Sequence, residues 1–223
     1  MRIANAGREI SLERLQSGSG CSLLLLHELY GSCGDWSATG RFDPCRHWTG
    51  PVFALDFAGH GASDWLSGGW YSPEGCVADA DLALAEIGSV AIAGAGLGAY
   101  VGLLLSGARP KEVLGTLLLP GMGLEGAGAE PKRDDYRDAW GGSLPTDLPP
   151  EVDPMTCCLA RDLRPVDYAR PFAEASAGLL LHQSSSPPPP WWEALDGRNV
   201  VHLQAHDHDA AASFRELTAR ANR

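Results

Sequence analysis

Short apolar runs that alternate with segments of helical spacing restrict the fold of this chain more than any other feature. The runs have the length of strands that helices bury on both faces, and they cover residues 21–26, 51–55, 90–93, 113–119, 178–181 and 200–203. Helical spacing occurs at 73–87 and 97–105, and a last apolar stripe comprises Ala210, Phe214, Leu217 and Ala221. This order predicts an α/β fold with a mostly parallel central sheet flanked by helices.

Three short motifs follow the first three of these strands. The strand at 21–26 leads into H-E-L-Y-G-S at 27–32, and the strand at 51–55 leads into D-F-A-G-H-G-A-S at 56–63. The strand at 90–93 leads into G-A-G-L-G at 94–98, which opens an apolar helix. A strand, a glycine turn and a helix in this order are typical of a nucleophile elbow, the sharp turn that exposes a nucleophilic side chain.

Together the three motifs resemble those of the α/β-hydrolase superfamily, and the resemblance extends from residue 22 to the C-terminus. In that superfamily the elbow reads G-x-S-x-G, H-G-x-x-G-S builds the oxyanion hole, and D-x-x-G-x-G-x-S follows the next strand. The resemblance implies the α/β-hydrolase fold. In this chain Gly96 stands where the serine would be, and Glu28 replaces the second residue of the oxyanion motif. The elbow therefore has no hydroxyl or thiol.

Glycine at the elbow has a physical consequence. A residue held there at positive φ is strained by about 1–3 kcal/mol if it has a side chain, and glycine is not. The resemblance implies that the backbone N–H groups of Leu29 and Leu97 form the oxyanion hole. The N–H groups of Gly96 and Leu97 also lie at a helix N-terminus, where partial positive charge favours an anion. We expect the oxyanion hole to remain although the nucleophile is missing.

The resemblance also places the two remaining members of a catalytic triad. The superfamily's histidine follows the last strand, which makes His208 the first candidate and His206 the second. The superfamily's acid follows the strand at 178–181, but residues 182–186 contain no carboxylate, so Glu125 or Glu28 is the candidate replacement. Glu28 is also a candidate catalytic group in its own right. A metal site of His202, His206 and His208 is an alternative that only loop spacing supports. We assign no metal and expect no cofactor.

Residues 121–177 interrupt the alternation of strands and helices. They are rich in glycine, proline and charge up to residue 150, and they regain helical spacing from residue 154. This length predicts a small lid, set into a core of residues 1–120 and 178–223. The aromatic residues around it predict an apolar pocket. Its candidate lining residues are His27, Tyr30, Trp36, Tyr136, Trp140 and Trp191.

The amino-acid composition argues against some classes of binding partner. The formal net charge of −11 argues against the basic surface that nucleic acid binding requires. No segment resembles a signal peptide or a membrane span, so we expect a cytoplasmic protein without a membrane partner. The six cysteines are scattered, and we expect free thiols. Nothing in the sequence indicates an oligomeric state.

Three hypotheses of function follow. In the first, the protein is an enzyme that acts on a small carbonyl-containing metabolite by histidine-centred acid–base and oxyanion-hole chemistry. Its reaction is then of lyase, cyclase or isomerase type, or a direct attack of water on an activated ester. In the second, the protein is a pseudo-hydrolase that binds a small ligand or partner without catalysis. In the third, it is a serine esterase in which residue 96 has been altered.

Overall fold

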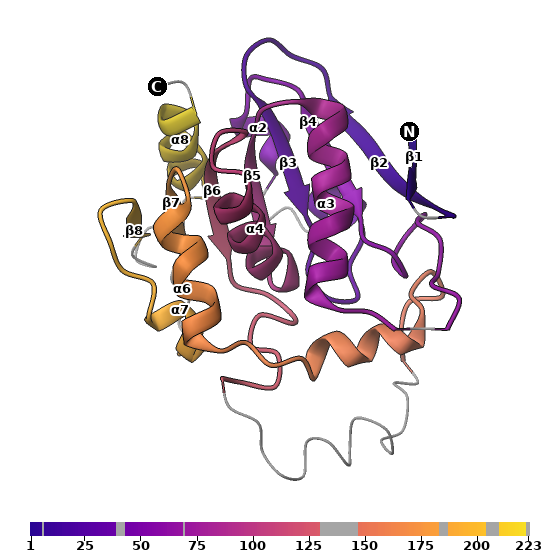
Figure 1. Ribbon diagram of the computed structural model, residues 1–223. Helices are drawn as coiled ribbons and strands as arrows, with labels where there is room; N and C mark the ends of the chain where they lie inside the picture. The colour runs from indigo at the N-terminus through magenta and orange to yellow at the C-terminus, as the bar shows by residue number, and fades with distance from the viewer. Residues whose placement is uncertain are drawn as a thin grey trace.

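The computed structural model describes residues 1–5, 7–38, 43–68, 70–129, 147–182, 187–203 and 210–221. Within these ranges the chain forms one sheet in the order β1-β2-β4-β3-β5-β6-β7-β8 (Figure 1). The strands are β1 (Arg2–Asn5), β2 (Arg8–Gln16), β3 (Ser22–Leu26), β4 (Val52–Asp56), β5 (Val90–Ala95), β6 (Val113–Leu119), β7 (Leu179–His182) and β8 (Val200–Leu203). All pairings from β4 to β8 are parallel. The predicted α/β fold with a mostly parallel sheet is confirmed.

The antiparallel edge of the sheet was not predicted from the sequence. There β1 pairs with β2, and β2 pairs with β4, antiparallel in both cases. In β2 the buried residues Ile10 and Leu12 alternate with half-buried or exposed ones. This alternation is typical of an antiparallel strand near a sheet edge, whereas the strands recognised in the sequence are continuous apolar runs.

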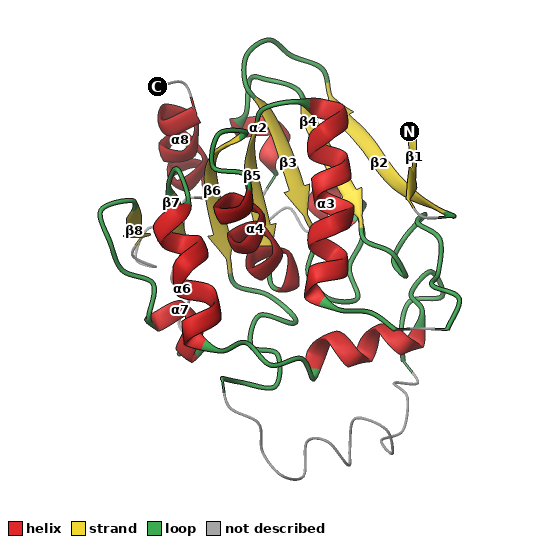
Figure 2. Cartoon of the chain, viewed as in Figure 1, coloured by secondary structure: helices red, strands yellow, loops and turns green. Residues whose placement is uncertain are grey.

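Helices cover both faces of the sheet (Figure 2). The helices are α1 (Asp35–Ala38), α2 (Pro44–His47), α3 (Pro73–Ile87), α4 (Leu97–Ala108), α6 (Val166–Ala175), α7 (Pro190–Glu193) and α8 (Ala210–Ala221). Successive residues of β3 point to opposite faces: Leu24 and Leu26 pack in one core cluster with residues of α3 and α4. Leu23 and Leu25 pack in another cluster with Phe214 and other residues of α8. Phe214, Leu217 and Ala221 of the stripe predicted for this last helix are thus buried against the sheet.

Local signals explain the bounds of α3, which coincide with the helix predicted at 73–87. Ser72 is the N-cap, and its hydroxyl accepts a hydrogen bond from the N–H of Gly75 at 3.1 Å. Pro73 occupies the first turn, where its missing N–H is not needed. Gly88 ends the helix at φ 88°, a conformation that glycine adopts without strain.

The segment between β6 and β7 contains a 3₁₀ helix, η1 (Pro154–Ala160), and α6. Helix α6 packs against α4, and its residues Ala169 and Ala173 are buried in the same core cluster as Leu179 and Leu181 of β7. The second half of this segment is therefore packed against the sheet layer. The division into a core and a lid at residues 121 and 177 stays a prediction.

No helix within the described ranges is both long enough and apolar enough to cross a membrane. The six cysteines all lie in these ranges, and none forms a disulfide.

Candidate functional site

The bend between β5 and α4 lies at residue 96. Gly96 is the N-cap of α4, with φ 54° and ψ −116°, and it makes no side-chain cap. A Cβ on Gly94 would overlap the carbonyl oxygen of Gly98, and a Cβ on Gly98 would overlap that of Leu26. The G-A-G-L-G sequence is thus required by the close approach of the strand, the helix and the neighbouring strand.

The chain itself fills the space in front of residue 96. A Cβ on Gly96 would overlap the carbonyl oxygen of Met122 and lie 2.8 Å from the Met122 nitrogen. Gly121 is also close, since its carbonyl carbon lies 2.8 Å from the same point. A serine at position 96 would therefore require residues 121 and 122 to move.

The two N–H groups predicted to form an oxyanion hole converge on a single oxygen atom. The N–H of Leu29 donates to the Met122 carbonyl at 3.1 Å, and the N–H of Leu97 donates to the same oxygen at 2.9 Å. Both donors have good hydrogen-bond geometry. The structure thus brings the two donors together, and their acceptor is part of the chain.

Glu28 binds the other backbone polar group of Met122, its N–H. The Oε2 atom of Glu28 accepts a hydrogen bond from the Met122 N–H at 2.6 Å, a short distance typical of a charged acceptor. Both polar groups of Met122 are therefore satisfied at the bend. In the structure Glu28 positions a segment of the backbone, and its predicted catalytic role stays a prediction.

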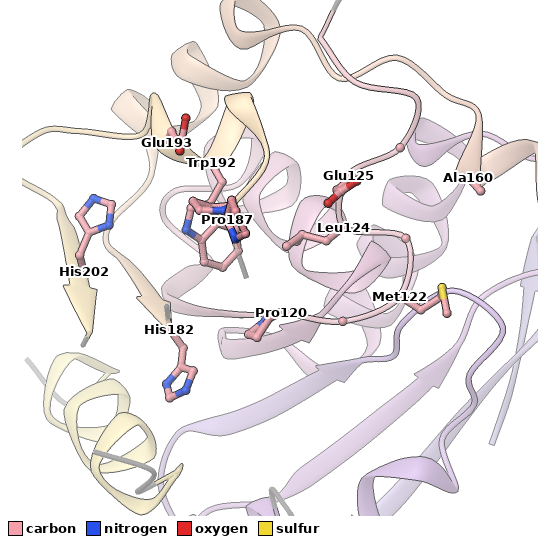
Figure 3. A pocket seen from close by; sticks show the side chains of 14 residues that line it. Pro120, Met122, Leu124, Glu125, Ala160, His182, Pro187, Trp192, Glu193 and His202 are labelled. Atoms are coloured by element: carbon pink, nitrogen blue, oxygen red, sulfur yellow. The ribbon is translucent and has the colours of Figure 1, made fainter. Parts of the chain in front are cut away.

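A cavity of about 860 Å³ lies at the carboxyl ends of β6 and β7 (Figure 3). Residues 120–126, which directly follow β6, form one part of its wall. The imidazoles of His182 and His202 lie on the side of β7 and β8. The lining residues are Pro120, Gly121, Met122, Gly123, Leu124, Glu125, Gly126, Ala160, His182, Pro187, Pro188, Trp192, Glu193 and His202. Ligands of open α/β sheets bind at this edge, so the cavity is the candidate site.

No protein-family model matches the chain, and no curated protein matches it. Solved structures do. A thermophilic esterase from Thermogutta terrifontis, with malate bound, is 15% identical with a TM-score of 0.70 over 100% of both chains. The monoacylglycerol lipase of Paleococcus ferrophilus is 16% identical with a TM-score of 0.68, over 95% of this chain and 99% of that one.

The chain has the α/β-hydrolase fold. A third structure, the bottromycin epimerase in complex with bottromycin A2, is 16% identical with a TM-score of 0.66, over 99% of this chain and 97% of that one. At identities this low the likeness establishes the fold alone. The activity has to be argued from the residues of the site.

The turn after β4 has a structural role in this α/β-hydrolase fold. Both carboxylate oxygens of Asp56 accept backbone hydrogen bonds, from Cys33 at 2.7 Å and from Ala62 at 3.0 Å. A Cβ on Gly61, which has φ 54°, would lie 2.5 Å from either oxygen. The hydroxyl of Ser63 donates to the Asp56 carbonyl at 2.6 Å. The D-F-A-G-H-G-A-S motif thus closes a loop around one buried carboxylate.

His27 is buried beneath the site. Its Nε2 accepts a hydrogen bond from the Phe57 N–H at 3.1 Å, which leaves the proton on Nδ1 for the Glu28 carbonyl at 2.7 Å. Burial lowers the pKa of His27, so the imidazole is held neutral. Both of its nitrogens are engaged by backbone, and it does not line the cavity.

The other predicted pocket residues also lie elsewhere. Tyr30 is half-buried beside one core cluster, and Trp36 is buried in another. Trp191 is buried, with its indole N–H donating to the Leu124 carbonyl at 3.0 Å and its ring 5.0 Å from that of Tyr100. None of these residues lines the cavity described above. The remaining predicted pocket residues, Tyr136 and Trp140, lie outside the described residues.

Of the histidines that the structure describes, two line the cavity, His182 and His202. His206 and His208 lie outside the described residues. His182 ends β7, and its Nδ1 is 3.2 Å from the Ser213 hydroxyl. His202 lies in β8, with Nε2 3.1 Å from the Leu195 carbonyl oxygen. The signal that could have identified both is their position at the carboxyl ends of parallel strands.

Two carboxylates complete the polar lining. Glu125 and Glu193 are both exposed, and they face the cavity together with the two imidazoles. Among the residues that the structure describes, no group of three or more histidine, cysteine, aspartate or glutamate side chains is arranged to hold a metal ion.

Proposed function

We propose that this protein binds a small organic ligand in the cavity beside β6, β7 and β8, without covalent catalysis at the elbow. The observation that carries the proposal is the Met122 carbonyl oxygen, which takes both oxyanion-hole hydrogen bonds in front of Gly96. Acyl transfer in this fold needs a nucleophile at that point and free donors for the developing oxyanion. This chain has glycine at the nucleophile position, and both donors are already bonded to the Met122 carbonyl.

The cavity supports the ligand-binding part of the proposal. Its volume of about 860 Å³ is in the range of small-molecule sites, roughly 300–1,000 Å³. Prolines, Leu124 and Trp192 provide apolar surface, and two imidazoles and two carboxylates provide a few polar groups. A mostly apolar wall with a few polar groups is the usual composition of a site for a small metabolite.

Ligand binding is tested by thermal unfolding against a panel of small metabolites. Leu124→Trp fills the cavity and is expected to abolish the stabilisation that a bound metabolite gives the native protein. The matched control is Leu82→Trp, at a half-buried position of α3 that does not line the cavity. Equal stabilisation of the two variants would show that the ligand binds elsewhere.

The absence of covalent catalysis is tested with an activated aryl ester. The native protein is expected to release the phenol at the background rate, and mass spectrometry is expected to find no acylated side chain. An acyl adduct on any residue would overturn the proposal. The same assay on Gly96→Ser addresses an esterase with an altered residue 96, a hypothesis that the crowded space around Gly96 does not support.

A second candidate is acid–base catalysis in the same cavity. The observation that favours it is the pair of imidazoles, His182 and His202, which line the cavity with Glu125 and Glu193. The bottromycin epimerase has the same fold, and an epimerisation moves a proton without breaking an ester bond. His206 and His208 remain proposed catalytic residues of this alternative.

Deuterium exchange separates the two candidates. A carbonyl metabolite that stabilises the protein is incubated with it in D₂O, and its mass is followed. Catalysis would introduce deuterium next to the carbonyl, and His182→Gln or His208→Ala would stop it. Binding without catalysis leaves the mass of the metabolite unchanged.

A further inference from the structure

Residues 121–124 lie in the bend where the nucleophile of this fold would project. The fit depends on glycine at two positions. A Cβ on Gly121 would lie 2.6 Å from the Glu28 carboxylate, and a Cβ on Gly123, which has φ 77°, would lie 2.6 Å from the Cβ of Leu29. A side chain at either position would require the segment or the residues that it contacts to shift. The approach is therefore encoded in the sequence of the segment.

Polar contacts hold this segment in place. Glu28 accepts from the Met122 N–H, and the buried guanidinium of Arg164 donates from Nη1 to the carbonyls of Gly123 and Leu124. The indole of Trp191 adds a hydrogen bond to the Leu124 carbonyl. The Met122 side chain is 57% exposed, so hydrophobic burial of that side chain does not anchor the segment.

The anchors differ in kind. Arg164 and Trp191 are fully buried and bind the end of the segment that leads away from the bend. Glu28 is half-buried and binds the peptide that lies directly in front of Gly96. Glu28 is thus the side chain that holds the Met122 carbonyl against its two N–H donors.

We propose that residues 121–124 fill the elbow of this chain and that the carboxylate of Glu28 holds them there. We call this carboxylate the latch. A carboxylate is a stronger acceptor for the Met122 N–H than a neutral oxygen. Releasing the latch frees the N–H groups of Leu29 and Leu97. Because the same segment is a wall of the cavity, its release also opens the cavity toward Gly96. Glu28 is a positioning residue in this device.

Amide hydrogen exchange, followed residue by residue by NMR on the full chain, tests the latch. The measured quantity is the exchange rate of the Leu29 and Leu97 amides relative to the Ile92 and Leu117 amides in the parallel ladders. In Glu28→Ala this ratio is expected to rise at least about tenfold, as the loss of a charge-assisted hydrogen bond implies. Glu28→Gln keeps an oxygen acceptor of the same shape but loses the charge, so its ratio is expected to lie between those of the native protein and Glu28→Ala.

The ratio keeps the test decisive if a variant loosens the whole fold, because all four amides then exchange faster together. A ratio in Glu28→Ala equal to the native ratio would overturn the proposal, whatever the stability of the variant. A second variant, Glu28→Gly, is expected to give the same rise as Glu28→Ala. The experiment needs no ligand, so its outcome is separate from that of the binding test.

Discussion

Two constraints disfavour a side chain at Gly96, and substitutions can measure them separately. Its φ of 54° disfavours any residue with a side chain, and the Met122 carbonyl occupies the space that a Cβ would need. Gly88 shares the first constraint, with φ 88°, but a Cβ there would meet no atom within 4 Å. Comparing the two glycines therefore isolates the contact with Met122.

Alanine at either position tests this contact. Gly88→Ala is expected to lower the free energy of unfolding by about 1 kcal/mol, from backbone strain alone. Gly96→Ala is expected to lower it by about 3 kcal/mol or more, because strain and overlap with residues 121 and 122 add. Urea unfolding of both variants measures the difference. Equal losses would mean that residues 121 and 122 do not occupy the bend in solution.

Two buried imidazoles, those of His27 and His60, lie side by side. The His60 ring is fully buried, with its centroid 5.0 Å from that of His27. Its Nδ1 is 3.2 Å from the Ala58 carbonyl oxygen, and its Nε2 has no hydrogen-bond partner. Burial, together with the neighbouring His27, lowers the pKa of His60 to about 3. The folded protein therefore keeps His60 neutral.

This lowered pKa predicts a loss of stability in mild acid. An unfolded histidine takes up a proton near pH 6.5 and the folded His60 does not, so the free energy of unfolding falls as the pH drops below about 6.5. The slope is at most about 1.4 kcal/mol per pH unit for one histidine. His60→Gln is expected to reduce the slope between pH 7 and pH 5, measured by urea unfolding.

The comparison with the variant cancels a second titration. Burial raises the pKa of Asp162 to about 6, so this group binds a proton in the same pH window and opposes the trend. Asp162 is present in both proteins. Identical slopes for the native protein and His60→Gln would contradict a neutral, buried His60.

At the scale of elements, Asp79 joins helix α3 to two strands. Its carboxylate accepts from Arg8 of β2 at 2.7 Å and from the N–H of Ala58, just after β4, at 3.0 Å. The Asp79 side chain is 1% exposed and that of Arg8 is 20% exposed. This ion pair is therefore mostly removed from solvent, and it attaches the antiparallel edge of the sheet to the helix layer.

Removing the arginine would leave a buried carboxylate without its cation. Arg8→Ala is expected to lower the free energy of unfolding by about 3 kcal/mol. The control is Arg2→Ala, because Arg2 pairs with Glu9 on the surface, where both side chains are about half exposed. That variant is expected to lose about 1 kcal/mol or less. Both free energies are measured by denaturant unfolding. Equal losses in the two variants would contradict a special role of the buried Asp79 ion pair.

For the molecule as a whole, the net charge of −11 bears on partners. A polyanion is repelled by an acidic protein, most strongly at low salt, where screening is weak. We expect no binding of a labelled DNA duplex or RNA hairpin, measured by fluorescence anisotropy in low-salt buffer. A rise in anisotropy that disappears on adding salt would show a basic surface that the net charge conceals.

The order of the elements along the chain is determined by the sequence itself. Helix spacing, strand length and capping residues are local signals, and the six apolar runs, the helix at 73–87 and the bend at residue 96 all follow from them. The edge strands β1 and β2 were missed because their alternation of apolar and polar residues is weaker than a continuous run.

The state of the site was decided only by tertiary structure. The resemblance of the motifs to those of α/β-hydrolases placed Gly96, Leu29 and Leu97 around one point, because each belongs to a turn next to a recognisable strand. Met122 fills that point through a contact with Glu28, 94 residues away in the sequence. The imidazoles of His182 and His202 line one cavity because β7 and β8 are neighbouring parallel strands. Such contacts depend on how elements pack in space, and no local pattern of residues encodes them.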